Sequence, residues 1–246
     1  MLQEETLNEH VRSTEMISCI VLNKKEISPR IFQVEFMTSQ PLNFSPGAYL
    51  VVSPEKKSGP KAYYSIASEP ESTSHLICVK RSNNPVAYYL DSLKSGDRFF
   101  TGRPVAQYCM TTRAPRSACF IATGTGISPF RSILLSRCYW SEPPRQTCLI
   151  AGFMDEKEAI FINDLASLSK ISIVLMLTRN PENALGLSGL PTYCGKVTDV
   201  LNERWNKSLE LLWKETDFYL CGQPAMIEEA RSLLGQRGVA QDSIFS

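Results

Sequence analysis

This chain lacks any cluster of cysteine or histidine. Its eight cysteines are scattered, no two form a Cys-x-x-Cys pair, and the two histidines are His10 and His75. An iron–sulfur cluster needs grouped thiolates and a structural zinc site needs grouped ligands, so we expect neither within this chain. A disulfide framework is not expected without an export signal, and the thiols are predicted to be reduced.

An excess of charge of one sign and long apolar runs are also missing. Lys and Arg number 26 against 25 for Asp and Glu, so no overall charge points to a nucleic acid as partner. No apolar run approaches the ~18 residues of a membrane span. The polar residues 1–15 do not resemble a secretory or transit signal. We therefore expect a cytoplasmic protein in which residues 1–15 form a flexible lead-in.

Residues 16–112 have the pattern of short strands separated by turns. Phe32, Val34 and Phe36 alternate with polar residues, which is the period of a strand with one buried face. Similar segments at 48–53, 63–68, 76–80 and 98–101 predict a small antiparallel β-barrel. Between them, Val86, Tyr89, Leu90 and Leu93 share one face of a predicted helix that stops at Ser95-Gly96.

Residues 117–246 are patterned differently, and the polar stretch 111–116 marks the expected boundary. The runs 118–122, 148–153, 171–177 and 218–221 are apolar without alternation, as in strands buried on both faces. Helical patterns lie between them, at 128–139, 158–168, 197–205 and 224–236. Such alternation predicts a parallel sheet with helices on both sides.

The segment Thr123-Gly124-Thr125-Gly126-Ile127-Ser128-Pro129 follows a predicted buried strand and opens a predicted helix. Glycines let the backbone approach a phosphate, and the helix N-terminus offers unpaired N–H groups and a positive dipole. Ser128 is expected to cap the helix and Pro129 to suit its first turn. The alternative is a glycine turn that only reverses the chain, but its context favours nucleotide binding.

A second strand–turn–helix segment runs from Phe218 through Cys221-Gly222 to Met226. Ligands of open parallel sheets bind at the carboxyl ends of strands, so this turn is expected at the same edge as the first. The alternative for Cys221 is a buried small apolar residue, as most free cysteines are.

Four motifs in order resemble the ferredoxin–NADP reductase and oxygenase-reductase family. They are Pro46-Gly47, Tyr64-Ser65-Ile66-Ala67-Ser68, the turn from Gly124 to Pro129, and Cys221-Gly222-x-Pro-x-Met. The resemblance runs from about residue 16 to the C-terminus. It implies a flavin-binding β-barrel, residues 16–112, that holds FAD. A Rossmann-like domain, residues 117–246, would hold NAD(P)H. Without this resemblance, the sequence of residues 63–68 would indicate only a β-strand and no binding role.

The resemblance also implies roles for individual residues. Tyr64 would stack on the isoalloxazine ring, and Ser65 would hydrogen-bond near the flavin nitrogen that exchanges hydride. Cys221 would align the nicotinamide carbon, so Ser65 and Cys221 are the candidate catalytic residues. The candidate cofactor-binding residues are these three with Ile66, Lys80, Val86, Ala87, Thr123, Gly124, Thr125, Gly126, Ser128, Arg179, Lys196, Gly222 and Met226.

Two cations favour NADPH over NADH. Arg179 and Lys196 stand where NADP-using relatives of this family carry cations, and a 2′-phosphate attracts positive charge. The alternative is that each is an ordinary surface residue, which is the commoner fate of Lys and Arg.

The departures from the family pattern concentrate on the flavin side. The family's arginine two residues before Tyr64 is Ala62 here, with Lys61 or Arg81 as candidate replacements. Asn83-Asn84-Pro85-Val86-Ala87 replaces the family's Gly-x-x-Ser segment.

Three hypotheses about function remain. The first is a reductase that passes hydride from NADPH to FAD and electrons onward to a small carrier such as ferredoxin or flavodoxin. The second is an electron-transfer subunit of an oxygenase or dehydrogenase complex. The third is a degenerate nucleotide-binding module with weak or no flavin binding.

Overall fold

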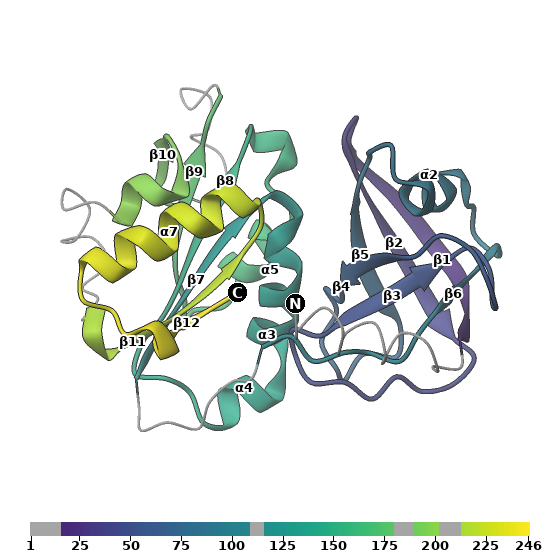
Figure 1. The fold of residues 1–246 in the computed structure, drawn as a ribbon, viewed down its shortest axis with the longest axis horizontal. Helices are drawn as coiled ribbons and strands as arrows, with labels where there is room; N and C mark the ends of the chain where they lie inside the picture. Colours follow the sequence, from purple (N-terminus) through teal and green to yellow (C-terminus); the bar gives the residue numbers. More distant parts are fainter. Residues whose placement is uncertain (1–15, 109–115, 180–188, 202–212) are drawn as a thin grey trace. The chain divides into compact units, whose positions relative to one another are not determined.

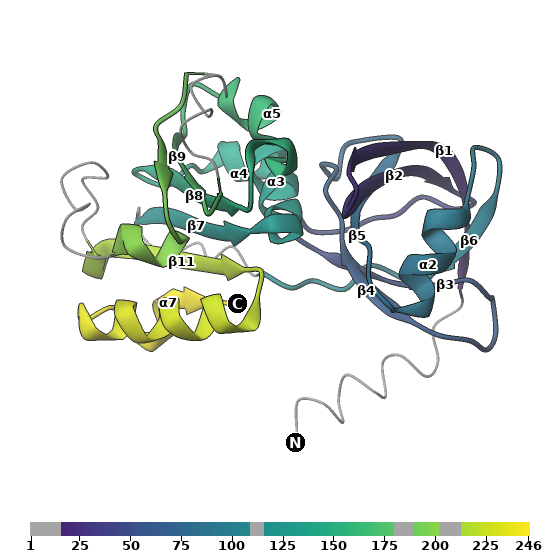
Figure 2. The same ribbon diagram turned by 90° about the horizontal axis from the view of Figure 1, so that it is seen from above.

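The structure is a computed structural model, and it describes residues 16–108, 116–179, 189–201 and 213–246. The expected lead-in at residues 1–15 and most of the expected boundary at 111–116 lie outside these residues. The chain divides into two compact units between Gln107 and Tyr108. Each unit is described here by itself (Figure 1 and Figure 2).

The first unit is an antiparallel β-barrel. Its strands pair in the order β4-β3-β6-β1-β2-β5, and a bridge between Ile66 and Ile77 joins the segment after β4 to β5, which closes the sheet. This confirms the expected architecture, although β4 ends at Ser65 and not at Ser68. The strands are β1 (Ile17–Ser28), β2 (Ile31–Thr38), β3 (Tyr49–Ser53), β4 (Ala62–Ser65), β5 (His75–Lys80) and β6 (Arg98–Thr101).

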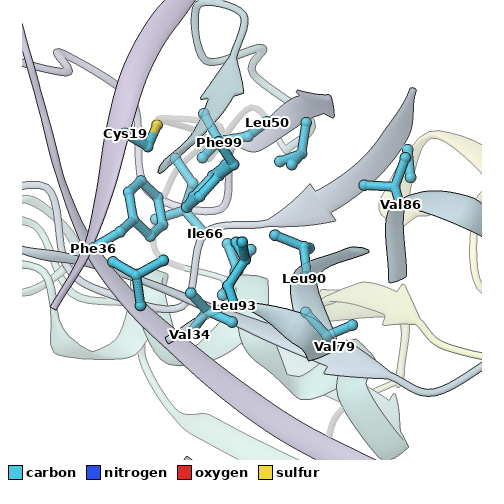
Figure 3. Close-up of a cluster of buried hydrophobic side chains, with 14 of the residues drawn as sticks. Cys19, Val34, Phe36, Leu50, Ile66, Val79, Val86, Leu90, Leu93 and Phe99 are labelled. Carbon is cyan, nitrogen blue, oxygen red and sulfur yellow. The ribbon is translucent and has the colours of Figure 1, made fainter. Parts of the chain in front are cut away.

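An apolar cluster fills the barrel (Figure 3). The rings of Phe36 and Phe99 meet edge to face, with centroids 5.0 Å apart. The helix α2 (Pro85–Ser92) adds Val86 and Leu90 to the cluster, and Leu93 follows just past its end. The face that the spacing predicts is therefore the buried face of this helix, and its burial fixes α2 against the barrel.

The second unit is a parallel six-stranded sheet in the order β10-β9-β8-β7-β11-β12. Its central strands are buried along most of their length, as runs without alternation predict. The strands are β7 (Ser117–Thr123), β8 (Thr147–Phe153), β9 (Ser172–Leu177), β10 (Thr192–Cys194), β11 (Thr216–Cys221) and β12 (Ile244–Phe245).

Helical elements cover both faces of this sheet. On one face, Ile121 and Leu220 belong to an apolar cluster with Met226 and Leu234 of α7 (Pro224–Gln236), the front helix in Figure 1. The 3-10 turn η4 (Val197–Leu201) joins the same cluster. On the other face, Phe120 packs on aromatic rings of α3 (Ser128–Leu135) and α4 (Arg137–Ser141).

Three of the expected helices differ from the structure. The helix expected at 128–139 is two helices, because Ser136 is extended and its hydroxyl accepts a hydrogen bond from the Tyr139 amide at 3.3 Å, which caps the second. The helix expected at 158–168 is only α5 (Ile162–Ala166), because Phe161 before it has a left-handed φ of 64°. The helix expected at 197–205 begins as η4, and its remainder lies outside the described residues.

Within the described residues, no helix has both the length and the apolar character that crossing a membrane would require. The same residues hold no group of His, Cys, Asp and Glu side chains suited to a metal ion.

Candidate functional site

Two turns meet at the carboxyl edge of the parallel sheet. β7 ends at Thr123, and a 3-10 turn, Gly124–Ile127, leads into α3. β11 ends at Cys221 and leads through Gly222 into α7. The two strands are neighbours in register, with Ala122 opposite Cys221. The two motifs therefore lie side by side at one edge of the sheet, where the sequence predicts a shared crevice.

The two turns are in van der Waals contact, and this contact requires glycine. A Cβ at Gly126 would lie 2.5 Å from the carbonyl oxygen of Cys221. Gly222 has φ of +145°, and a Cβ there would collide with Thr123. The Thr123 hydroxyl also accepts a hydrogen bond from the Gln223 amide at 3.0 Å. The glycines thus join the turns into one backbone surface instead of only reversing the chain.

Ser128 does not cap α3, which corrects the expectation. The capping position is Ile127, with no side-chain hydrogen bond, while Pro129 occupies the first turn as expected. The Ser128 hydroxyl is buried and has no hydrogen-bond partner in the structure. A buried hydroxyl without a partner is costly unless a ligand completes it. Its place at a helix N-terminus is suited to a phosphate oxygen of a nucleotide.

Tyr108 supports the end of β11, a contact that no sequence motif indicates. Its buried hydroxyl donates a hydrogen bond of 2.9 Å to the carbonyl oxygen of Leu220, 112 residues away. Burial raises the pKa of the Cys221 thiol, and a hydrogen bond from Tyr108 offsets part of this effect. The thiol is therefore held neutral next to the crevice, which suits a packing role better than a nucleophilic one.

Two further candidates on this unit lie in or beside the two turns. Thr125 is partly buried, and its carbonyl accepts the Ser128 amide. Met226 is buried in the apolar cluster beneath α7, and its methyl group lies near Gly222. Met226 therefore supports the turn from below.

Arg179 and Lys196 follow the ends of two neighbouring strands, β9 and β10. Both are exposed. The Lys196 amide donates to the Asp199 carboxylate at 2.7 Å, and its ammonium group lies 3.8 Å from the carboxylate of Glu229 on α7. Sequence reasoning missed Glu229, because its separation from Lys196 along the chain carries no pattern. An exposed ion pair at this distance contributes little to stability, so the lysine remains able to turn to a stronger anion.

The flavin-side candidates lie at the end of β4. Tyr64 is partly buried against the barrel core, and burial raises its pKa to about 12, so the phenol stays neutral. Ser65 is partly buried opposite Tyr49, and Ile66 is fully buried with its amide bonded to the Ala48 carbonyl. Tyr64 and Ser65 therefore offer an aromatic face and a hydroxyl at one strand end, which fits a planar ring system. Lys80, at the end of β5, is exposed.

The groups expected to hold a diphosphate are arranged differently. The Asn84 side chain accepts hydrogen bonds from the amides of Val86 at 2.8 Å and Ala87 at 3.4 Å, so these amides are already paired. Ala62 belongs to the barrel core. The flavin site thus fits the ring of FAD, whereas the diphosphate meets none of the family's anchors.

Arg81, considered above as a replacement for the missing arginine, is held elsewhere. Its guanidinium contacts the Asp91 carboxylate at 2.6 Å and the Glu26 carboxylate at 2.7 Å, and it lies over the Phe32 ring. Hydrogen bonds from Arg81 lower the pKa of Asp91 and hold it charged. Lys24 bonds the same carboxylate. This cluster ties α2 to β1 and neutralises the charge of Arg81.

Comparisons with known proteins agree with this arrangement. Residues 120–232 match the family described as the oxidoreductase NAD-binding domain. A flavohemoprotein of Bacillus subtilis is 23% identical over 92% of this chain and 57% of its own length. One subunit of the Na(+)-translocating NADH-quinone reductase of Pasteurella multocida is 24% identical over 74% of this chain and 47% of its own length. The chain thus spans about half the length of these curated relatives.

A solved structure has the same fold. The ferredoxin NADP+ reductase from Neisseria gonorrhoeae, with bound FAD and NADP, superposes with a TM-score of 0.81 at 21% identity. The match covers 93% of this chain and 94% of that one. The fold predicted from the four motifs is therefore confirmed, and the chain is similar in sequence to reductases of the kind that the motifs resemble.

Proposed function

Because the chain has the fold of ferredoxin–NADP reductases and carries an oxidoreductase NAD-binding domain, we propose that it transfers hydride between a nicotinamide nucleotide and a flavin. One observation carries the proposal: the interlocked turns at Gly126 and Cys221, with the unpartnered Ser128 hydroxyl at the start of α3. Backbone that approaches this closely beside a helix N-terminus is suited to a pyrophosphate.

The residues of the second unit bind and orient the nucleotide. The backbone from Thr123 to Gly126 and the Ser128 hydroxyl receive the pyrophosphate. Gly222 keeps the crevice open, and the neutral thiol of Cys221 packs beside the nicotinamide ring. In the barrel, Tyr64 provides the stacking surface for the flavin ring and Ser65 a hydroxyl near its edge. A bound flavin supplies the two-electron chemistry, and the chain supplies position and electrostatics.

NADPH is the proposed donor. Arg179 and Lys196 follow neighbouring strand ends at the edge that carries the crevice, and both are exposed to an incoming 2′-phosphate. The opposite charge of Glu229 near Lys196 tempers this preference and leaves NADH as a weaker substrate.

A small electron carrier such as ferredoxin or flavodoxin is the proposed acceptor. The second candidate is an electron-transfer subunit of a larger complex, and the similarity to one subunit of an NADH-quinone reductase favours it. The two candidates can be distinguished experimentally, since a subunit of a complex would need its partner subunits to reach its full rate of electron transfer.

The test is anaerobic mixing of the purified protein and flavin with NADPH or NADH, followed by flavin absorbance in a stopped-flow instrument. Bleaching at a rate that saturates with nucleotide is expected, because the nucleotide binds before hydride moves. Gly126→Ala serves as the control with a damaged crevice. Bleaching no faster than with flavin and nucleotide alone would rule out the proposed function.

A further inference from the structure

Resting on this proposed function, we infer that the barrel recognises the flavin by its ring system alone. Riboflavin, FMN and FAD then bind with similar affinity, and the flavin exchanges with solution as a substrate. The reduced flavin then leaves the barrel and delivers its electrons to the acceptor in solution. Three features of the barrel lead to this inference: the cap of α2, the place of Ala62 and the ion pairs of Arg81.

The N-terminus of α2 is closed by its own side chain. Asn84 Oδ1 lies 2.8 Å from the Val86 amide and 3.4 Å from the Ala87 amide, and Pro85 between them has no N–H to offer. The buried side chains of Val86 and Leu90 fix this turn against the barrel core, as Figure 3 shows. A phosphate group would have to displace a hydrogen-bonded side chain to reach these amides.

None of the residues considered above as diphosphate ligands offers a buried, unpaired positive charge. Ala62 is 9% exposed and lies in the barrel core, so its position carries no charge. The guanidinium of Arg81 is shared by the carboxylates of Asp91 and Glu26, 2.6 and 2.7 Å away. Lys61 and Lys80 are exposed, where water and salt screen a charge. An adenosine diphosphate group therefore gains little from these four residues.

The two groups proposed to contact the flavin ring, in contrast, lie together at the end of β4. Tyr64 keeps a neutral aromatic face at the end of β4, with the hydroxyl of Ser65 next to it. The neighbouring Tyr63 is 55% exposed and meets Tyr49 edge to face, with ring centroids 5.7 Å apart. Stacking and edge hydrogen bonds recognise the part that riboflavin, FMN and FAD share.

The reaction balances with the flavin as substrate. NAD(P)H, oxidised flavin and one proton give NAD(P)⁺ and dihydroflavin. The C4–H bond of the nicotinamide breaks, its hydrogen and two electrons form an N–H bond at flavin N5, and the second proton comes from water. The nicotinamide is oxidised and the flavin is reduced. The dihydroflavin then dissociates with both electrons.

The experiment measures the dissociation constants of riboflavin, FMN and FAD by quenching of flavin fluorescence. The three constants are expected to agree within about threefold, since each charge-assisted hydrogen bond to a phosphate would add roughly tenfold or more. FAD binding more than about tenfold tighter than riboflavin would overturn the inference and leave the proposed function intact. Failure of both NADPH and NADH to reduce any of the three flavins would overturn the proposed function and this inference together.

Asn84→Gly isolates the cap. Glycine at an N-cap retains most of the helix stability and leaves the amides of Val86 and Ala87 open. FMN and FAD should bind several-fold tighter in this variant, and riboflavin should bind as before. Asn83→Gly removes the neighbouring exposed asparagine and should change none of the three. Unchanged FMN and FAD binding in Asn84→Gly would show that the cap does not exclude the phosphate.

Discussion

Gly126 lies so close to the backbone of Cys221, at the end of β11, that no side chain fits at position 126. A Cβ at Gly126 would lie 2.5 Å from the carbonyl oxygen and 2.7 Å from the carbonyl carbon of Cys221. Both opposing atoms belong to backbone, which cannot turn away as the tip of a side chain does. The distance between the two turns, where we propose that the nucleotide binds, is thereby fixed.

Gly126→Ala is therefore expected to weaken nucleotide binding roughly 5- to 150-fold, because overpacking that costs about 1–3 kcal/mol separates the two turns. Calorimetric titration with NADP⁺ measures this. Gly235→Ala in α7 is the control, since a Cβ there meets nothing within 4 Å. It should leave binding unchanged and stabilise the fold by roughly 0.5–1 kcal/mol. Equal nucleotide affinity in both variants would contradict the role given to this contact.

Much of this site follows from the sequence, because its signals are local. The run before Thr123 is apolar without alternation, and the structure buries that strand between two helical layers. Glycines, a proline and a helix start follow within seven residues. The N-cap at Asn84 was missed, because the family resemblance pointed instead to Val86 and Ala87 as cofactor-binding residues.

What the sequence could not provide depends on distant partners. Tyr108 and Leu220 are 112 residues apart, and nothing in either segment indicates their hydrogen bond. The long strand β1 was not predicted for a different reason. Ile20 and Leu22 are 36% and 37% exposed, and these outward apolar residues erase the alternation that marks a half-buried strand.

The double variant Arg179→Ala/Lys196→Ala should lose most of the preference for NADPH. Only NADPH offers a 2′-phosphate to these cations, so its Michaelis constant should rise while that of NADH changes little. Steady-state kinetics with both nucleotides measures the ratio. Lys170→Ala is the matched control, because this lysine precedes the amino end of β9, the opposite edge of the sheet. A wild-type protein that reduces flavin faster with NADH would reject the assignment.

His75 makes the stability of the barrel depend on pH. Burial beside Phe36 and Phe44 lowers the pKa of His75, so the folded protein keeps the imidazole neutral. The unfolded chain takes up a proton below pH about 6.5, and stability therefore falls as the pH drops from there towards the lowered pKa. Asp91, whose pKa is lowered by Arg81, affects the stability only at more acidic pH.

Thermal unfolding between pH 7.5 and 5 should show this loss in the wild-type protein. In His75→Gln the melting temperature should change less over the same range, whatever its value at pH 7.5. An equal slope in both proteins would mean that another group causes the dependence.

Tyr108→Phe should slow hydride transfer without weakening nucleotide binding. Loss of the hydroxyl leaves the Leu220 carbonyl without this donor and frees the end of β11, at a cost of about 1–3 kcal/mol. Tyr139→Phe is the control, since its hydroxyl bonds Thr147 at the opposite end of the sheet at 2.8 Å. Both variants should lose stability, and only Tyr108→Phe should bleach the flavin more slowly. Equal rates of flavin bleaching in the two variants would show that Tyr108 contributes only to packing.

Cys221 itself is expected to align the nicotinamide ring and to take no part in redox chemistry. Burial raises the pKa of its thiol, and the chain has no Cys-x-x-Cys partner for a dithiol cycle. Cys221→Ser keeps the size of the side chain, whereas Cys221→Ala leaves a gap beside the ring. A misplacement of ~1 Å can slow such a step ~100-fold, so the alanine variant should be the slower of the two. Both should still bind nucleotide. Single-turnover flavin bleaching by NADPH measures the step, and wild-type rates in both variants would leave Cys221 as a core thiol only.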